Sequence, residues 1–212
     1  MAESAKEVIL ARIRAALAAA PETPPAPRAY LRHDTRDREA IIAELIDRIR
    51  DYKANVERVE LAALPAAIAE ACARYGVRRL VAPADAPAEW IPAGVATLRD
   101  DPPLTNGELN GSDAVLTGCA FAVAQTGTIA LDGGAYQGRR ALSLVPDRHL
   151  CVVRVEQVVG IVPEVIERLA SQPSRPITFI SGPSATSDIE LSRVEGVHGP
   201  RTLHVLLVGA AG

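Results

Sequence analysis

The stretch that decides the fold class is LHVLLVG, residues 203–209, an apolar run that ends at a glycine. A second run, PITFIS at residues 176–181, has the same character, because it too is short, apolar and bounded by turn residues. Runs of this kind are typical of strands that are buried between covering layers. We therefore expect both runs to be buried strands.

Working outward from these runs, helical and strand patterns alternate in the first half of the chain. Apolar residues recur at helical spacing in residues 35–52 and 61–76, and Gly76 stands where a helix C-cap belongs. The remaining strand candidates are ANVERV (54–59), VRRLVAP (77–83), GVATLR (94–99), AVLTGCAFAVA (114–124), GTIALD (127–132), ALSLVP (141–146) and LCVVRV (150–155). This order predicts an α/β protein with a mixed sheet and flanking helices.

The N-terminal segment differs from the rest of the chain. A short amphipathic helix is followed by PETPPAP, residues 21–27, whose prolines favour an extended linker. We therefore expect an N-terminal arm at 1–28 and a single α/β domain at 29–212. The helix of the arm either packs on its own domain or contacts a partner or second subunit, which leaves a homo-oligomer open.

Charge and composition exclude several classes of function. The net charge is −3 and no basic cluster is interleaved with aromatic residues, which argues against nucleic acid. No charge-free run approaches the roughly 20 residues of a membrane span, and the N-terminus does not resemble a secretory signal. We expect a soluble, cytoplasmic protein without membrane contact.

The cysteines and histidines predict no metal centre. Cys72, Cys119 and Cys151 are far apart and form no Cys-x-x-Cys motif, as expected of buried, reduced thiols. The four histidines never occur at the spacing of metal ligands. We expect this chain to bind no metal and no iron–sulfur cluster.

Three polar turns stand between the apolar runs. In AQTGTIALDGG (124–134) a glycine between two threonines can aim backbone N–H groups and hydroxyls at one point. SGPSATSDIE (181–190) is rich in residues that cap helices and could hold an anion, and EGVHGP (195–200) places a histidine between glycines. Taken one at a time, each is also compatible with an ordinary turn.

Four segments taken together resemble a known family. AFAVAQTGTIAL, LSLVPDRHLCVV, ISGPSATSDIE and GVHGPRTLHVLLV occur in this order, and by them the chain is identified as a member of the LUD-domain family. The resemblance covers most of the sequence from about residue 40 onward. It implies a Rossmann-like mixed sheet similar to the sugar-phosphate isomerase and CoA-transferase (NagB/RpiA/CoA-transferase-like) superfamily.

The resemblance also implies a function. Bacterial members act with companion proteins, at least one of them an iron–sulfur protein, to oxidise L-lactate to pyruvate. The chain is then an accessory, non-redox component, with the iron–sulfur clusters in its partners. The alternative is a stand-alone enzyme acting on a small phosphorylated or CoA-linked metabolite, so the sequence leaves open whether the chain is itself an enzyme.

We expect the three turns to converge on a small carboxylate or phosphate. His198 is the only candidate proton carrier, and the candidate ligand-binding residues are Gln125, Thr126, Gly127, Thr128, Gly182, Ser184, Thr186 and Asp188. Many relatives carry an acidic residue where this chain has Gln125. An amide cannot act as a general base near neutral pH, so Gln125 would orient a ligand by hydrogen bonds instead.

Overall fold

The computed structural model describes residues 4–18, 24–186, 194–195 and 199–209 of the chain. It divides into two units, Met1–Tyr30 and Leu31–Gly212. The first unit contains helix α1, Ala5–Leu17. This helix begins with a capping box, in which the Ser4 and Glu7 side chains each accept a hydrogen bond from the other residue's backbone N–H. The domain boundaries expected at 1–28 and 29–212 stay predictions.

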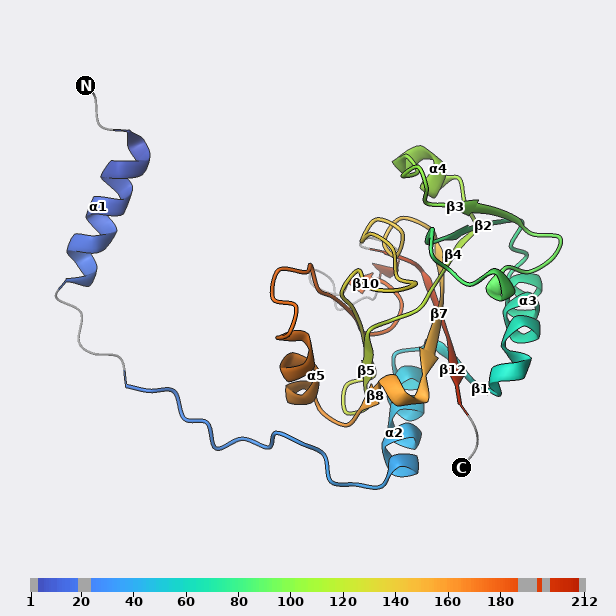
Figure 1. The fold of residues 1–212 in the computed structure, drawn as a ribbon, viewed down its shortest axis with the longest axis horizontal. Helices are drawn as coiled ribbons and strands as arrows, with labels where there is room; N and C mark the ends of the chain where they lie inside the picture. The colour runs from blue at the N-terminus through green and yellow to red at the C-terminus, as the bar shows by residue number, and fades with distance from the viewer. Residues whose placement is uncertain (1–3, 19–23, 187–193, 196–198, 210–212) are drawn as a thin grey trace. The chain divides into compact units, whose positions relative to one another are not determined.

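The second unit is built around a parallel sheet of six strands in the order β1-β12-β7-β4-β2-β3 (Figure 1). The strands are β1 Asn55–Val59, β2 Arg79–Ala82, β3 Ala96–Arg99, β4 Ala114–Thr117, β7 Arg148–Arg154 and β12 Thr202–Val208. From β2 the chain passes to β3 on one side and then to β4 on the other. The strand order therefore reverses between β2 and β4, which is a topological switch point.

A second, mixed sheet of four strands has the order β8-β5-β6-β9. Its strands are β5 Phe121–Val123, β6 Thr128–Leu131, β8 Val158–Val159 and β9 Thr178–Ile180. β6 is antiparallel to both β5 and β9, whereas β5 and β8 are parallel. A two-stranded antiparallel pair, β10 Ala185–Thr186 and β11 Val194–Glu195, completes the strands of the described chain.

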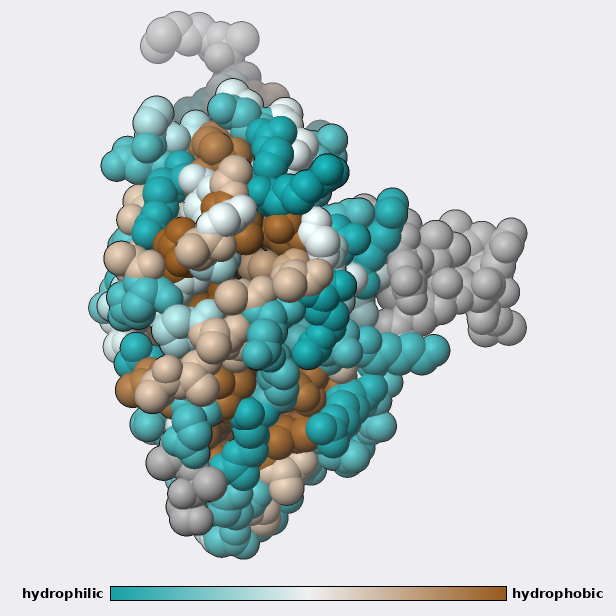
Figure 2. Space-filling model, turned by 90° about the vertical axis from the view of Figure 1, so that its right-hand side faces the viewer, coloured by the Kyte–Doolittle hydropathy of each residue, from teal (hydrophilic) through white to brown (hydrophobic). Residues whose placement is uncertain are grey.

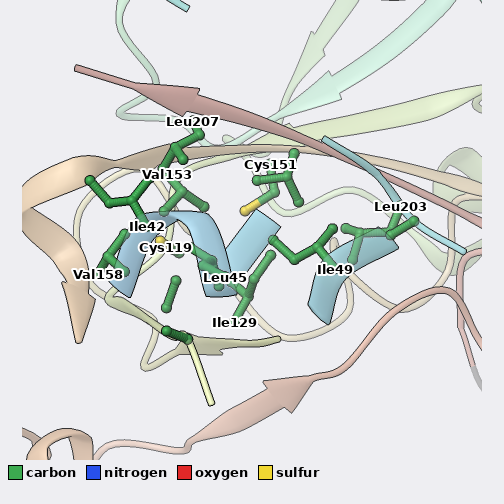
Figure 3. Packing of buried hydrophobic residues seen from close by; sticks show 14 of the residues in the cluster. Ile42, Leu45, Ile49, Cys119, Ile129, Cys151, Val153, Val158, Leu203 and Leu207 are labelled. Carbon is green, nitrogen blue, oxygen red and sulfur yellow. The ribbon is translucent and has the colours of Figure 1, made fainter. Parts of the chain in front are cut away.

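The two faces of the parallel sheet are covered by different elements. Successive side chains of β7 and β12 point to opposite faces. On one face Cys151, Val153 and Leu207 pack against α2, Arg38–Asp51, and against the second sheet (Figure 3). On the other face Leu150 and Leu206 pack against α3, Leu64–Arg74. The other helices are α4 Asn106–Asn110, α5 Val162–Leu169 and the 3-10 helices η1 Leu61–Ala63, η2 Ala88–Trp90 and η3 Val155–Gln157.

The α/β class and the flanking helices expected from the sequence are confirmed, with the mixed pairing confined to the second sheet. LHVLLVG forms most of β12, a buried strand with neighbours on both sides. PITFIS was expected to be a buried strand as well; residues 178–180 form a strand, but the expected burial was wrong, because none of the six residues is buried. β9 is an edge strand, and the Phe179 side chain on it is 49% exposed.

The strand expected at ALSLVP, residues 141–146, was also wrong. The segment forms local turns, with the backbone N–H groups of Leu142 and Leu144 bonded to carbonyls three residues earlier. Its apolar character has another cause, because Leu142 is fully buried in a small cluster with Val81, Leu109 and Val115. A buried turn and a buried strand give the same local composition.

The surface on the side of α3 carries apolar patches that polar side chains separate from one another (Figure 2). In the part of the chain that is described, no helix is both long and apolar enough to cross a membrane.

Candidate functional site

A cavity of ≈ 310 Å³ lies between the two sheets, against the first residues of β7 and β12. We call it the His149 cavity. β7 and β12 contribute His149 and Leu203, and the turn before β7 contributes Arg140 and Ser143. Its remaining wall is formed by β9 with the residues that follow it, 178–184, and by residues 199–200.

His149 is the polar group at the base of this cavity. Its side chain is 1% exposed, and its Nε2 lies 2.7 Å from the Oγ1 of Thr117 at the end of β4. Its Nδ1 is buried and has no hydrogen-bond partner among the described residues. Such an atom is costly to bury unless a ligand or water completes its hydrogen bonding. Because a threonine hydroxyl can donate or accept, either imidazole tautomer fits this contact.

The charge of the cavity favours an anion. No Asp or Glu occurs among the described lining residues, and their only ionisable side chains are Arg140 and His149. The exposed Arg140 guanidinium forms no ion pair within the described chain. The hydroxyls of Ser143 and Ser181 add polar groups beside these two side chains. A guanidinium and an imidazole without a competing carboxylate can bind a carboxylate or phosphate.

The loops that border the cavity are connected to one another. Thr128 accepts a hydrogen bond from the Thr126 hydroxyl at 2.8 Å, and its Oγ1 lies 2.7 Å from the Oγ of Ser181. The Ser184 N–H donates to the carbonyl of Pro200 at 2.8 Å. Hydrogen bonds thus connect the turn at 126–128 to the segment at 181–184, and that segment to Pro200, two residues before β12.

Two glycines fasten these loops to the last turn of α2 and the residue after it. Gly127 has a φ of 59°, and a Cβ there would lie 2.9 Å from backbone and side-chain carbons of Arg48. Gly182 has a φ of 81°, and a Cβ there would lie 2.6 Å from the Cβ of Tyr52. At both positions the left-handed backbone and the close approach require glycine. These two glycines set the position of the cavity wall.

Of the residues singled out in the sequence, Gly182 and Ser184 line the His149 cavity. Thr128 reaches it through Ser181, whereas Gln125, Thr126 and Gly127 are not among the lining residues. The Gln125 side chain is exposed, and the backbone N–H of this residue donates to the carbonyl of Gly160 at 3.0 Å. The functional roles assigned to these residues stay predictions.

The three other singled-out residues are not tested as site residues. Thr186 lies on β10, where the backbone pairing with Val194 is described. Asp188 and His198 lie outside the described residues. Sequence reasoning missed His149, although a histidine just ahead of the apolar run at 150–153 could have drawn attention to it. Its contact with Thr117 depends on the pairing of β4 with β7, which no local pattern contains.

Within the described ranges, no three His, Cys, Asp or Glu side chains lie close enough together to hold a metal ion. Cys119 and Cys151 are buried and are not joined by a disulfide. A hydrogen bond with Cys151 and burial raise the pKa of the Cys119 thiol, which therefore stays protonated. That the chain binds no cofactor or metal stays a prediction.

Comparison with known proteins supplies a family. The model of the LUD domain matches residues 42–208, which include every residue given above as lining the cavity. The chain is 55% identical over 174 residues to lactate utilization protein C of Deinococcus radiodurans, with 81% of each chain covered. It is 32% identical to lactate utilization protein C of Geobacillus kaustophilus, over 64% of this chain and 58% of the relative.

A solved structure is also similar. The crystal structure of a DUF162 family protein from Deinococcus radiodurans matches with a TM-score of 0.72 and 48% sequence identity. The match covers 82% of this chain and 99% of that one. The α/β architecture is therefore shared with a protein of known structure.

Proposed function

The chain belongs to the LUD-domain family, and we propose that it takes part in lactate utilization by binding a small carboxylate in the His149 cavity. Membership in the family confirms the resemblance noted in the sequence. The observation that carries the proposal is the buried, unpartnered Nδ1 of His149 in a cavity whose described walls include Arg140 and no acidic side chain. The names of the relatives point to lactate, and pyruvate is the carboxylate that its oxidation yields.

The site can hold and orient such a ligand. In the proposed complex Arg140 neutralises the carboxylate, and the imidazole N–H at Nδ1 donates a hydrogen bond to one of its oxygens. In the same proposal the hydroxyls of Ser143 and Ser181, which line the cavity, bond the oxygen on the second carbon, a hydroxyl in lactate and a ketone in pyruvate. Thr117 holds the imidazole ring through Nε2.

We also propose that the chain works as an accessory component beside iron–sulfur partner proteins. Oxidation of lactate to pyruvate releases two electrons and two protons, and in this proposal the partners accept the electrons. The names of the relatives support a role in a lactate-utilization system. Affinity purification from lactate-grown source cells, followed by iron analysis, tests it. Recovery of an iron-free protein without cysteine-rich partners would contradict it.

The binding proposal is tested by calorimetry with L-lactate and pyruvate on the full chain and on His149→Gln. The glutamine amide can keep the hydrogen bond to Thr117 but has no atom in the place of Nδ1. A lost hydrogen bond to a charged group is worth about 1.5–3 kcal/mol, so we expect the Kd to rise roughly 10- to 100-fold.

The control is His33→Gln, the same exchange at an exposed histidine that does not line the cavity. It should bind both carboxylates as the unmodified chain does. Equal affinities of the unmodified chain and His149→Gln, or no binding of either carboxylate, would refute the assignment of this cavity.

A further inference from the structure

A second cavity, of ≈ 160 Å³, lies at the carboxyl ends of β4 and β7. We call it the Trp90 cavity. Gly118 follows β4, Arg154 ends β7, and Trp90 lies on η2 in the connection that follows β2, so the cavity is lined from three neighbouring strands or their connections. β2 and β4 flank the topological switch point. In open α/β sheets ligands bind in the crevice outside the carboxyl ends of the strands at such a point.

One wall of the Trp90 cavity is held in an unusual backbone conformation. Tyr136 has a φ of 63°, in the left-handed region that side chains other than glycine rarely adopt. Its N–H donates to the Oδ2 of Asp85 at 2.8 Å, and its carbonyl accepts from the N–H of Gly118 at 2.7 Å. The loops after β2 and β4 therefore hold Tyr136 from both sides. Backbone strain retained in this way is concentrated at ligand sites.

The aromatic part of the wall is a pair of rings. The Trp90 and Tyr136 rings meet edge to face, with centroids 5.5 Å apart and an interplanar angle of 62°. Trp90 is 4% exposed, so its ring is fixed by packing. A Cβ on Gly118 would lie 3.3 Å from the Cβ of Tyr136, which leaves little room for any larger residue beneath the rings.

The lining of the cavity also includes a cationic side chain. Arg154 is the only ionisable group among the described lining residues apart from Cys119 and Tyr136, and it forms no ion pair with a carboxylate in the described chain. The turn that carries it is ordered by Gln157, whose Oε1 accepts from the Arg154 N–H at 2.8 Å. The Nε2 of the same side chain donates to the Cys119 carbonyl at 2.6 Å. A hydrogen bond with Cys151 and burial raise the pKa of the Cys119 thiol, so that this lining group carries no charge of its own.

We infer that the Trp90 cavity is a second ligand site, for a small planar organic anion of about one ring. The aromatic pair contacts the flat body of the ligand, and Arg154 binds its carboxylate. The size is suitable, because a protein cavity of about 150 Å³ holds benzene. This inference does not depend on lactate, since the His149 cavity lies on the opposite face of the sheet.

The chain carries its own reporter for this site. Trp90 is its only tryptophan, so a ligand that contacts the indole ring should change the intrinsic fluorescence of the protein. The probe is benzoate, and benzyl alcohol, which has a similar shape and no charge, is the matched comparison. We expect the fluorescence change to saturate with benzoate. The Kd of benzyl alcohol should be at least roughly 10-fold higher than that of benzoate.

Variants then assign the site. Arg154→Gln should weaken benzoate binding roughly 10- to 100-fold while leaving the response to benzyl alcohol unchanged. Arg50→Gln, an exposed exchange on α2, should behave as the unmodified chain. Equal melting temperatures of the variants would show that loss of binding is not loss of folding.

Three results would overturn the inference. They are a fluorescence change that does not saturate, an Arg154→Gln variant that binds benzoate as well as the unmodified chain, and loss of the benzoate response in His149→Gln. Loss of lactate binding in His149→Gln with the benzoate response retained supports two separate sites.

Discussion

The His149 cavity and the Trp90 cavity lie at opposite ends of the strands and on opposite faces of one parallel sheet. The first lies against the starts of β7 and β12 on the α2 side and is lined by an imidazole and hydroxyls. The second lies at the ends of β4 and β7 near Trp90, which packs on the α3 side, and combines an aromatic pair with a guanidinium. The same scaffold thus presents two different chemistries.

Adjacent residues serve the two cavities. Thr117 bonds His149, and Gly118, the next residue, lines the Trp90 cavity. Successive residues of a strand face opposite sides of a sheet. One short segment can therefore contribute to both cavities, while the ligand of each cavity stays on its own side of the sheet. A substitution should therefore be able to impair ligand binding in one cavity without impairing it in the other.

The largest expected effect comes from a pair of alanine substitutions, Gly182→Ala and Gly118→Ala. Gly182→Ala should destabilise the protein by about 2–6 kcal/mol, because backbone strain and overpacking against Tyr52 each cost about 1–3 kcal/mol. Gly118 has no left-handed φ and a looser contact, so its variant should lose only about 1 kcal/mol, the low end of the cost of overpacking. Urea denaturation measures both.

The same pair separates the binding sites. Gly182→Ala should weaken lactate binding and spare the benzoate response, and Gly118→Ala should do the reverse. If either variant impaired both ligands equally, the two cavities would have to be regarded as one coupled site.

A smaller effect is expected from Asp132→Asn. Although burial opposes ionisation, hydrogen bonds from Arg175, Gln137 and Gly134 hold the pKa of Asp132 below its usual value. This carboxylate orders the loop that carries Tyr136. Loss of its charge should cost about 1.5–3 kcal/mol in urea denaturation and reduce benzoate binding more than lactate binding.

The matched control is Asp147→Asn. Asp147 is exposed and its oxygen lies 3.6 Å from Arg201, so the exchange should change stability by less than about 1 kcal/mol. A loss equal to that of Asp132→Asn would contradict the assigned role of the buried carboxylate.

The smallest expected effect is the contribution of one buried histidine of the parallel sheet to the pH dependence of stability. His204 on β12 is 1% exposed, and burial lowers its pKa below the usual 6.5 despite a hydrogen bond with Glu57. The unfolded chain therefore binds more protons as the pH falls below 6.5. Stability should decline there with a slope of at most about 1.4 kcal/mol per pH unit from this residue.

Urea denaturation between about pH 8 and pH 5 measures this slope, with His204→Gln as the comparison. The variant should show a shallower dependence, since its amide does not titrate. An unchanged slope in the variant would assign the acid sensitivity to other groups.

Much of the fold could be predicted from local patterns, because apolar runs such as LHVLLVG reveal buried strands. The order of the strands could not, since pairings such as β1 with β12 join residues far apart in the sequence. Gly182 and Ser184 were predicted as site residues because turns have a recognisable composition. His149 and Trp90 were missed because their significance comes from strand register and from the meeting of separate loops.

The position of β12 also governs how the sheet can form. Among the described strands β1 pairs only with β12, and β12 pairs with β7 in the interior of the sheet. The first strand of the domain can therefore join the sheet only after the last strand is in place. Such pairings require closure of long loops before any contact forms, which slows folding. An intermediate that lacks β12 would leave β1 detached and one edge of β7 open to other chains. Refolding at high protein concentration should therefore compete with aggregation at this gap.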